Sequence, residues 1–431
     1  MKRILLWLAL GCLPLISSAS SYFVAIYGDD SNPGTWEQPF RHLSKGASIA
    51  VAGDMVIVRD GVYDNESVVA PGYVVTLYNS GTPSAPITFI AEHRGGAVLD
   101  AMNTVTNDRP CDGASAYINV ANASYIVIQG FVITRACDDA IHNNASAHDI
   151  IVRQNEFHHI ANRVITDHYG RVATGCATEG HDIIIDANVI HDIGRINNGF
   201  TTSLDHGLYT SCNNETITNN IFYNQVSGWD IQLANGANNV LVANNTFASQ
   251  NPGQAGQIMV WKSHKNLNIR NNIFFNAPQY AITNNAERVS GCEIDHNIIS
   301  GPAAVYSGTG CKRDFNQMDT DPMFVQPEAH DYDLLAGSPA IAAGVNIPEV
   351  AEDAAGTSRP TYWPFDVGAY QLIRIDLSAD FSRTQSHGAW LSPKLFQECT
   401  DRTGLLPPNL PYPGAKFLPL RQNACASSRI Y

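Results

Sequence analysis

The sequence carries little charge and few basic residues. Charged residues make up 15% of its 431 positions, and 26 Lys and Arg stand against 40 Asp and Glu, a net charge of −14. Without an excess of cations to neutralise phosphates, nucleic acid is excluded as a partner. A hydrophobic fraction of 44% excludes a disordered chain. Long apolar runs are missing beyond the N-terminus, so we expect no membrane segment in the mature protein.

The first residues are typical of a secretory signal peptide. Lys2 and Arg3 precede an apolar run at 4–10, and small residues ending at Ala19 fit a cleavage site. The run is too short to span a bilayer. We therefore predict that residues 1–19 are removed and that a monomer reaches the extracellular space or periplasm. A lipoprotein modified at Cys12 is a weaker alternative, because the residues before Cys12 fit that pattern poorly.

Eight cysteines remain after this cleavage. An even number in an oxidising compartment predicts disulfides, with scattered buried thiols as the alternative. Order along the chain suggests three pairs and leaves a fourth, although sequence alone does not fix the connectivity: Cys176 with Cys212, Cys292 with Cys311, Cys399 with Cys425, and Cys111 with Cys137.

The middle of the chain repeats a unit of the form aliphatic-x-x-Asn-x-apolar. Its six copies are spaced by 33, 32, 25, 27 and 25 residues and centre on Asn155, Asn188, Asn220, Asn245, Asn272 and Asn297. An earlier copy has Phe131 where the others have Asn. Such a period indicates a solenoid. Alternating apolar residues around the Asn indicate short strands, and Asn tolerates a left-handed turn while its amide bonds neighbouring chain. We therefore predict a parallel β-helix with a stacked internal Asn ladder.

Both ends of this solenoid are expected to be capped. Residues 39–50 have apolar positions at helical spacing, and the strand Met55–Val58 follows, so a helix should cover the first coil. Residues 321–370 form an irregular cap at the far end. The pattern stops after residue 372, which gives three predicted parts: a signal peptide at 1–19, a β-helix domain at 20–372 and an irregular tail at 373–431.

Several short motifs carry a resemblance. They are Tyr27-Gly28-Asp29-Asp30-Ser31-Asn32-Pro33-Gly34-Thr35, Gly61-Val62-Tyr63, Ser338-Pro339-Ala340-Ile341 and Asp366-Val367-Gly368-Ala369-Tyr370. With them, residues 22–372 resemble secreted right-handed parallel β-helix proteins, a polysaccharide-lyase-like group with the pectin-lyase fold. The resemblance implies an all-β, right-handed solenoid. Because the group includes lyases, uronate epimerases and glycoside hydrolases, function must be argued from the site.

Two coils are longer than the rest, and loops on a rigid scaffold often carry function. The insertions occupy residues 168–177 and 194–203, and eight of the fourteen His lie between His142 and His206. The preceding strands align by inward residues, as Ile141, Leu208, Ile231, Ile258 and Ile282. Their outward neighbours then stack as His142, Tyr209, Gln232, Met259 and Thr283, with His206 opposite Trp229 and Gly207 opposite Asp230.

A groove with aromatic faces, amides and imidazoles suits a polysaccharide. β-Elimination on a uronic-acid polymer needs a group that neutralises the carboxylate, a base for the C5 proton and an acid for the leaving oxygen. The candidate bases are His206, beside Asp205, and Lys262, and the candidate acid is Tyr209. Substrate-binding candidates, of which the arginines would neutralise the carboxylate, are His142, Arg163, Arg171, Trp229, Asp230 and Gln232. Lys262 in a solvated turn, a capping role for His206 and packing of Tyr209 are the structural alternatives.

A metal is a further option for neutralising the carboxylate. Asp138-Asp139 and Asp319-x-Asp321 offer oxygen ligands of the kind that Ca²⁺ takes, although neither has a specific spacing. We expect no other cofactor. A glycoside hydrolase would instead use two carboxyl groups, for which Asp205 and Asp230 on neighbouring coils are candidates. A non-catalytic glycan-binding protein is the third possibility.

Overall fold

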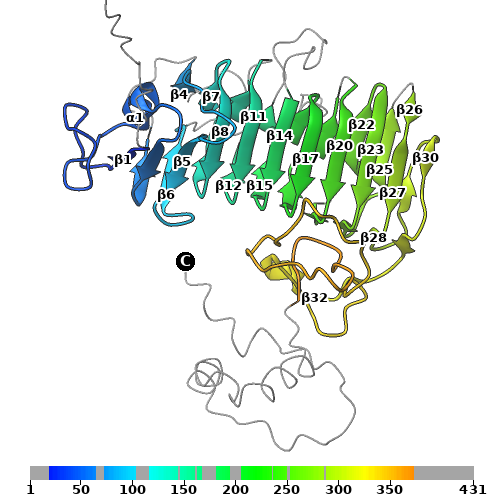
Figure 1. Ribbon diagram of the computed structural model, residues 1–431. Coiled ribbons are helices and arrows are strands. Elements are labelled where there is room, and N and C mark those ends of the chain that lie inside the picture. The colour runs from blue at the N-terminus through cyan, green and yellow to red at the C-terminus, as the bar shows by residue number, and fades with distance from the viewer. Residues whose placement is uncertain are drawn as a thin grey trace, which may run out of the picture.

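The computed structural model describes residues 19–64, 72–102, 116–143, 146–160, 163–166, 181–194, 205–234, 236–249, 253–285 and 288–372. Within these ranges the strands form three parallel sheets of twelve, ten and nine strands, wound as successive coils of one solenoid (Figure 1). The predicted all-β parallel β-helix is confirmed. Among the described residues no helix reaches the length and apolar character needed to cross a membrane.

The twelve-stranded sheet begins each full coil. Its neighbouring strands, in order, are β1 (Ser21–Val24), β2 (Met55–Val58), β5 (Ile87–Ala91), β8 (Ser124–Gln129), β11 (His148–Arg153), β14 (His181–Asp186), β17 (Asn213–Thr218), β20 (Asn238–Ala243), β23 (His264–Arg270), β27 (Cys292–Asp295) and β30 (Cys311–Lys312), with β26 (Val289–Ser290) also paired to β23.

The ten-stranded sheet follows it across a corner in each coil. Its strands are β3 (Gly61–Tyr63), β6 (Ala97–Asp100), β9 (Val132–Thr134), β12 (Glu156–His158), β15 (Val189–Ile193), β18 (Ile221–Gln225), β21 (Thr246–Phe247), β24 (Ile273–Phe274), β28 (Ile298–Ile299) and β31 (Gln317–Met318).

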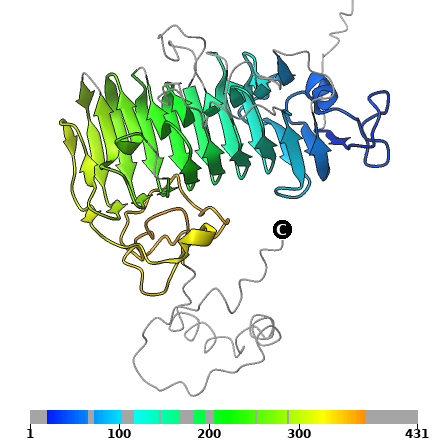
Figure 2. The ribbon, with the colours of Figure 1, turned by 180° about the vertical axis from the view of Figure 1, so that it is seen from behind.

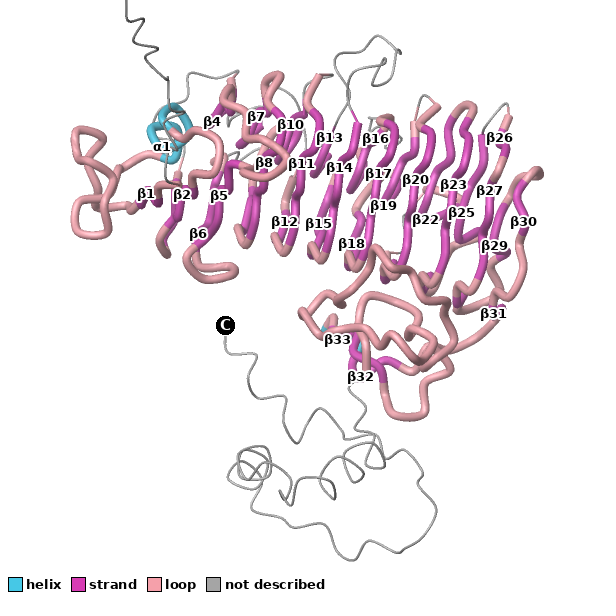
Figure 3. Tube along the Cα trace, viewed as in Figure 1, coloured by secondary structure: helices cyan, strands magenta, loops and turns pink. Residues whose placement is uncertain are grey.

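The nine-stranded sheet closes each coil and carries the predicted groove. Its strands are β4 (Tyr73–Leu77), β7 (Ala116–Val120), β10 (Asp139–Asn143), β13 (Arg163–Thr166), β16 (His206–Thr210), β19 (Trp229–Leu233), β22 (Gly256–Trp261), β25 (Tyr280–Asn285) and β29 (Ala304–Tyr306). Figure 3 shows these strands following one another along the solenoid.

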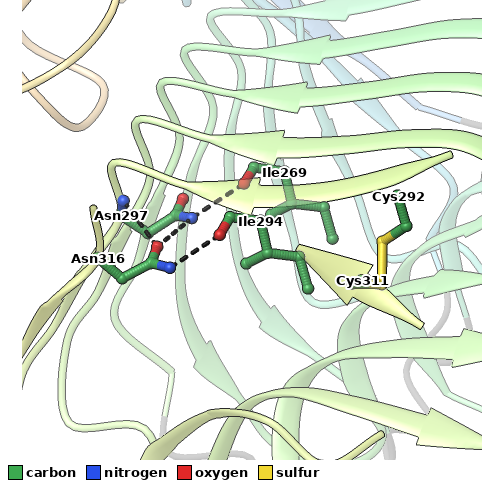
Figure 4. The surroundings of a disulfide bond; sticks show 6 residues. All are labelled: Ile269, Cys292, Ile294, Asn297, Cys311 and Asn316. Atoms are coloured by element: carbon green, nitrogen blue, oxygen red, sulfur yellow. Dashed lines mark hydrogen bonds between the residues drawn. A yellow bond between two sulfur atoms is a disulfide. The ribbon is translucent and has the colours of Figure 1, made fainter. Parts of the chain in front are cut away.

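The predicted Asn ladder is present at the corner between the twelve-stranded and ten-stranded sheets. Each ladder Asn donates its Nδ2 to the side-chain oxygen of the next, and its backbone N–H donates to the same oxygen; for Asn220 and Asn245 the distances are 3.0 and 2.9 Å. The ladder has one more member than predicted, because Asn316 accepts from Asn297 (Figure 4). The spacing of 19 residues hid this copy from the sequence pattern.

The left-handed backbone at this corner belongs to the residue before each ladder Asn, and not to the ladder Asn itself. These residues, with φ between 52° and 57°, are Gln154, Ala187, Asn219, Asn244, Asn271, His296 and Phe315. Asn-Asn pairs in three coils therefore divide the labour predicted for one Asn: the first residue makes the turn and the second makes the ladder.

Inside the coils, side chains of one kind stack in register. Phe222, Phe247 and Phe274 are fully buried and their rings stack at 5.0 and 4.9 Å. Each buried Phe contributes roughly 1.5–3 kcal/mol through removal from water. The pairing that aligns them, Phe222 with Phe247 and Phe247 with Phe274, is the register that positions every other column of the solenoid.

The N-terminal cap is the helix α1 (Leu43–Ile49), as predicted. It buries Leu43, Gly46 and Ala47 against the first coil. An added Cβ on Gly46 would lie 2.7 Å from a methyl of Val56 in β2, so the helix can approach this closely only with glycine at that position. Strand β1 lies beside it and pairs with β2.

The C-terminal segment is irregular, as predicted, but its position differs from the prediction. Instead of closing the far end, residues 321–372 lie along the side of the solenoid, over the ten-stranded sheet (Figure 2). They contain the antiparallel hairpin of β32 (Phe324–Gln326) and β33 (Asp331–Leu334), joined by η2 (Pro327–Ala329). Apolar residues on the outer face of that sheet explain the position, because Ile221, Ile273 and Ile298 pack against this segment.

One predicted disulfide is observed directly. Cys292 and Cys311 are bonded, with a Cα–Cα distance of 4.6 Å, and they join β27 to β30 (Figure 4). Cys212 is also disulfide-bonded, and its predicted partner Cys176 lies outside the described residues. Cys137 is buried. Three further cysteines of the predicted pairs lie outside the described residues: Cys111, Cys399 and Cys425. The predicted signal peptide, apart from Ala19, and the predicted tail at 373–431 lie outside them too.

Candidate functional site

The columns predicted for the nine-stranded sheet are confirmed, with one strand added. Ile141, Leu208, Ile231, Ile258 and Ile282 are fully buried and form one column, and the backbone of β13 pairs at Ile165 with Ile141 on one side and Leu208 on the other. The outward column is His142, Tyr209, Gln232, Met259 and Thr283, and in backbone register Thr166 stands between His142 and Tyr209. The missed strand has the same arrangement as β10, with an isoleucine at its third position and a polar residue after it.

His142 is held in place by a neighbouring carboxylate. Its Nδ1 lies 3.0 Å from Oδ2 of Asp139, and the side chains are 13% and 5% exposed. Tyr73 stacks on the imidazole with ring centroids 5.7 Å apart. When Nδ1–H donates to the carboxylate, the Nε2 of the neutral ring carries the lone pair. His142 is therefore oriented as a base would need to be.

His206, one of the two candidate bases, is completely buried. Its ring stacks on Tyr209 at 5.4 Å and on Trp229 at 5.6 Å. The carboxylate of the adjacent Asp205 accepts a hydrogen bond of 2.9 Å from Ser227. A ring packed between two aromatic side chains is well placed to hold Tyr209, which is only half-buried.

Two glycines let the coils of β16 and β19 approach each other here. A Cβ on Gly207 would lie 2.5 Å from the carbonyl oxygen of Asp230. A Cβ on Gly228, where φ is +75°, would lie 1.4 Å from the carbonyl oxygen of Asp205. This close packing explains why Asp230 and Gln232 are only 0% and 8% exposed. The coils of β16 and β19 are thus closely packed. We call the surface formed by β10, β13, β16 and β19 the floor of the site.

Arg163 lies in the middle of this group by backbone register. It pairs with Asp139 on one side and with His206 on the other, while His206 pairs with Trp229. Neighbouring strands are about 4.8 Å apart, so a cationic residue stands between the Asp139–His142 pair and the His206–Tyr209 pair. The other arginine candidate, Arg171, lies outside the described residues, as do both insertions apart from Gly194.

Lys262 is not brought together with His206. It is exposed, has a φ of +65° and lies in the turn between β22 and β23. Through the register from Leu208 to Ile258, it stands six residues further along the strand direction than His206 and two coils away. At about 3.3 Å per residue this is roughly 20 Å along the sheet. Next in this turn, buried His264 bonds the carbonyls of Trp261 and Ala237, and burial lowers its pKa.

The two aspartate pairs considered for Ca²⁺ have other partners. Asp139 holds His142, and Oδ1 of Asp321 accepts from the backbone N–H of Met323 at 2.8 Å. Among the described residues, neither pair belongs to a group of three ligating side chains. A Ca²⁺ ion takes six to eight oxygen ligands, among them backbone carbonyls and water, so these aspartates would supply only part of its coordination.

Comparison with known proteins places this geometry in a family. The uncharacterized protein YwoF of Bacillus subtilis (strain 168) is 36% identical over 72 residues, which is 17% of this chain and 14% of that protein. The crystal structure of pectate lyase Pel9A is similar at a TM-score of 0.55 and 14% identity, covering 83% of this chain and 97% of that one. A structure described as a glycoside hydrolase matches at a TM-score of 0.50 and 10% identity, covering 74% and 99%. At these identities the two structures show the fold alone.

A family model provides the assignment. The model of the Pel9A-like right-handed β-helix region matches residues 22–247, from β1 to the end of β21, and so includes the floor formed by β10, β13, β16 and β19. Because this match covers more than half of the 431 residues, the chain belongs to the family of Pel9A-like right-handed β-helix proteins.

Proposed function

We propose that this protein is a secreted carbohydrate-active enzyme that cleaves a uronic-acid-containing polysaccharide by β-elimination. The fold is one shared by polysaccharide lyases and glycoside hydrolases. The observation that carries the proposal is the row of functional groups on four neighbouring strands, β10, β13, β16 and β19. There, an oriented imidazole, a cationic residue and a half-buried phenol follow one another.

The three tasks of elimination are assigned to three of these residues. Arg163 neutralises the substrate carboxylate, which makes the C5 proton acidic. His142 accepts that proton at Nε2, because Asp139 holds its Nδ1. Tyr209 protonates the leaving oxygen. The strands of His142 and Tyr209 are two strand spacings apart, about 10 Å, which leaves room for a sugar unit between these two side chains.

His206 is then a positioning residue for Tyr209, since it is buried beneath that ring. Trp229 and Gln232 complete the floor on the next coil. This assignment favours His142 over His206 and Lys262 as the base. His206 is buried, and Lys262 lies roughly 20 Å away along the sheet.

Hydrolysis on the same face is the less favoured reaction. The candidate carboxylates, Asp205 and Asp230, lie on adjoining coils, but they are 1% and 0% exposed. Ser227 holds the carboxylate of Asp205. A hydrolase needs one carboxyl group at the scissile oxygen and another at the sugar or at an attacking water, so buried carboxylates support a structural role.

The test is incubation of the purified protein with a panel of acidic and neutral polysaccharides. The absorbance of unsaturated uronate and the number of new reducing ends are followed together. We expect both to rise on an acidic polysaccharide. New ends without the absorbance would indicate a hydrolase, and neither would indicate a glycan-binding protein.

Variants then test the roles. His142→Gln and Tyr209→Phe should each lower kcat by about 10²–10⁴, and Arg163→Gln should lower kcat/KM. Lys265→Ala is the matched control, because Lys265 is exposed at the start of β23 and lies outside the proposed site. Full activity of His142→Gln with loss in Lys262→Ala would refute the assignment of the base.

A further inference from the structure

A His-Asp dipeptide is repeated at the start of two neighbouring strands. His148-Asp149 opens β11 and His181-Asp182 opens β14 of the twelve-stranded sheet. Ile150 pairs directly with Ile183, so the two dipeptides lie one above the other in successive coils. Their imidazoles are stacked, with centroids 4.9 Å apart and an interplanar angle of 18°.

Each of these imidazoles is oriented by its own aspartate. Nδ1 of His148 lies 2.7 Å from Oδ2 of Asp149, and His181 makes the same contact with Asp182. Both aspartates have a left-handed backbone, with φ of 55° and 58°. A neutral ring that donates Nδ1–H to a carboxylate keeps its lone pair on Nε2. For His181 this leaves Nε2 available to a metal ion, with Asp182 as the orienting carboxylate. Asp149, in contrast, is a candidate ligand, and its carboxylate gives up the contact with Nδ1 of His148 when it binds an ion.

The donors are close together and open to solvent. One ligand atom from each of His148, Asp149 and His181 lies within 4.8 Å of the other two. The three side chains are 30%, 32% and 41% exposed. Side chains that are this exposed can rotate by the ångström or so needed to reach metal–nitrogen distances of about 2.0–2.1 Å. Tyr125 lies against the edge of His148, at 5.6 Å between the rings, and closes one side of the group.

A third copy of the dipeptide has a different environment. His191-Asp192 lies in β15 of the ten-stranded sheet, and there Nδ1 faces Asp192 at 2.7 Å while Nε2 faces Glu156 at 3.2 Å. Burial opposes protonation, but these two carboxylates outweigh it and raise the pKa of His191. A ring held by carboxylates at both nitrogens favours a proton. His148 and His181 instead face each other.

The pairing is also confined to these two coils. In the next coil the same positions are Asn213 and Asn214, whose amides bond Asn238 and Asn239 and continue an exposed amide ladder. In such a ladder each amide donates to the next and accepts from the one before. A neutral imidazole instead has one nitrogen with a free lone pair, and a metal ion can bind that nitrogen.

We propose that His148, Asp149 and His181 form a binding site for a divalent transition-metal ion such as Zn²⁺, with Asp182 orienting His181. Two imidazole nitrogens and one carboxylate are donors typical of Zn²⁺ and poor for Ca²⁺ or Mg²⁺. The site lies on the twelve-stranded sheet, apart from the floor of the nine-stranded sheet to which catalysis is assigned. The proposed metal site can therefore be tested independently of the proposed function.

The test is titration of the chelator-treated, full-length mature protein with Co²⁺, followed by its visible absorption, and with Zn²⁺ in competition. His148→Gln and His181→Gln should each remove one equivalent of bound ion. Asp182→Asn should keep the stoichiometry but weaken binding by about 10–100-fold. His93→Gln is the matched control, because exposed His93 belongs to a different carboxylate-rich group with Asp60 and Glu92. It should leave this equivalent in place.

The outcomes are distinct. Loss of the ion in both single variants, with retention in His93→Gln, would support the site. Retention in the double variant His148→Gln/His181→Gln, or loss only in His93→Gln, would overturn it. So would a wild-type protein that binds no ion. Circular dichroism in the presence of chelator checks that the variants are folded. Should either histidine variant fail to fold, Asp182→Asn decides, and unchanged affinity there would count against the proposal.

Discussion

Replacing Asn220 with Leu tests the internal ladder most directly. Asn220 is fully buried near the middle of the ladder. Its Nδ2 donates to the carbonyl of Ile185 at 2.8 Å and to Asn245 at 3.0 Å, and its Oδ1 accepts from the backbone and side chain of Asn188, both at 3.0 Å. Leucine is similar in size but makes none of these four hydrogen bonds.

The expected loss of stability depends on which hydrogen-bond partners of Asn220 keep another hydrogen bond in the variant. Asn245 Oδ1 still accepts from the backbone N–H of residue 220, and Asn188 Nδ2 still donates to Val152. The backbone N–H of Asn188 and one acceptor position on the carbonyl of Ile185 lose their partner. Each buried group left without a partner costs about 1–3 kcal/mol. We therefore expect the free energy of unfolding to fall by about 2–6 kcal/mol.

Denaturant unfolding followed by far-UV circular dichroism measures this loss. Asn268→Leu is the control, because Asn268 is half-buried on the outer face of β23. Asn316→Leu should cost less than Asn220→Leu, since Asn316 ends the ladder and is only partly buried. If Asn220→Leu and Asn268→Leu unfold at the same denaturant concentration, the ladder does not contribute as argued.

Three further predictions concern covalent, ionic and metal contributions. Cys311→Ser should lower the free energy of unfolding by about 3 kcal/mol under non-reducing conditions, because the disulfide closes a loop of about 20 residues; an equal midpoint with and without reductant in the wild type would contradict this. Glu156→Gln should destabilise the protein most between about pH 4.5 and 6.5. The hydrogen bond from His191 lowers the pKa of Glu156, so its contribution is lost as pH falls through that lowered value. The pKa of His191 is raised despite burial, so its contribution is lost as pH rises through that raised value; a wild-type–variant difference that does not change with pH would refute it. Polysaccharide cleavage should survive treatment with EGTA, because Arg163 supplies the positive charge, and a loss restored by Ca²⁺ would assign that role to a metal.

The solenoid could be predicted because its repeat is a local pattern with a physical cause. Each coil needs a residue that turns the chain and an amide that bonds the next coil. The repeated Asn marks the position of both in the sequence. The inward apolar residues of the strands that precede the Asn units then predicted the column from Ile141 to Ile282. The strand pairing confirms this column. Asn316 and the strand of Ile165 were missed because one coil is shorter and the other is followed by a long insertion.

The site was predicted less completely, because burial depends on the packing of neighbouring coils. Nothing local to His206 indicates that its ring lies between Tyr209 and Trp229. Lys262 lies in the turn after β22, and its distance from His206 depends on how far each strand extends. The oriented pair Asp139–His142 has a sequence signal, which is a carboxylate three residues before an outward His.

The lateral C-terminal segment has a consequence for how the protein unfolds. In a solenoid each coil contacts only its neighbours, so coils can be lost one at a time from either end. Here one segment bonds coils that are far apart: Arg94 to Ala354, Asn219 to Glu352, Asn244 to Asp366 and Gln317 to Pro339. Unwinding any one of these coils also breaks its hydrogen bond to the segment. We therefore expect the coils from Arg94 to Gln317 to unfold more cooperatively than those of a plain solenoid, and the described elements before Arg94, such as β1, β2 and α1, to fray first.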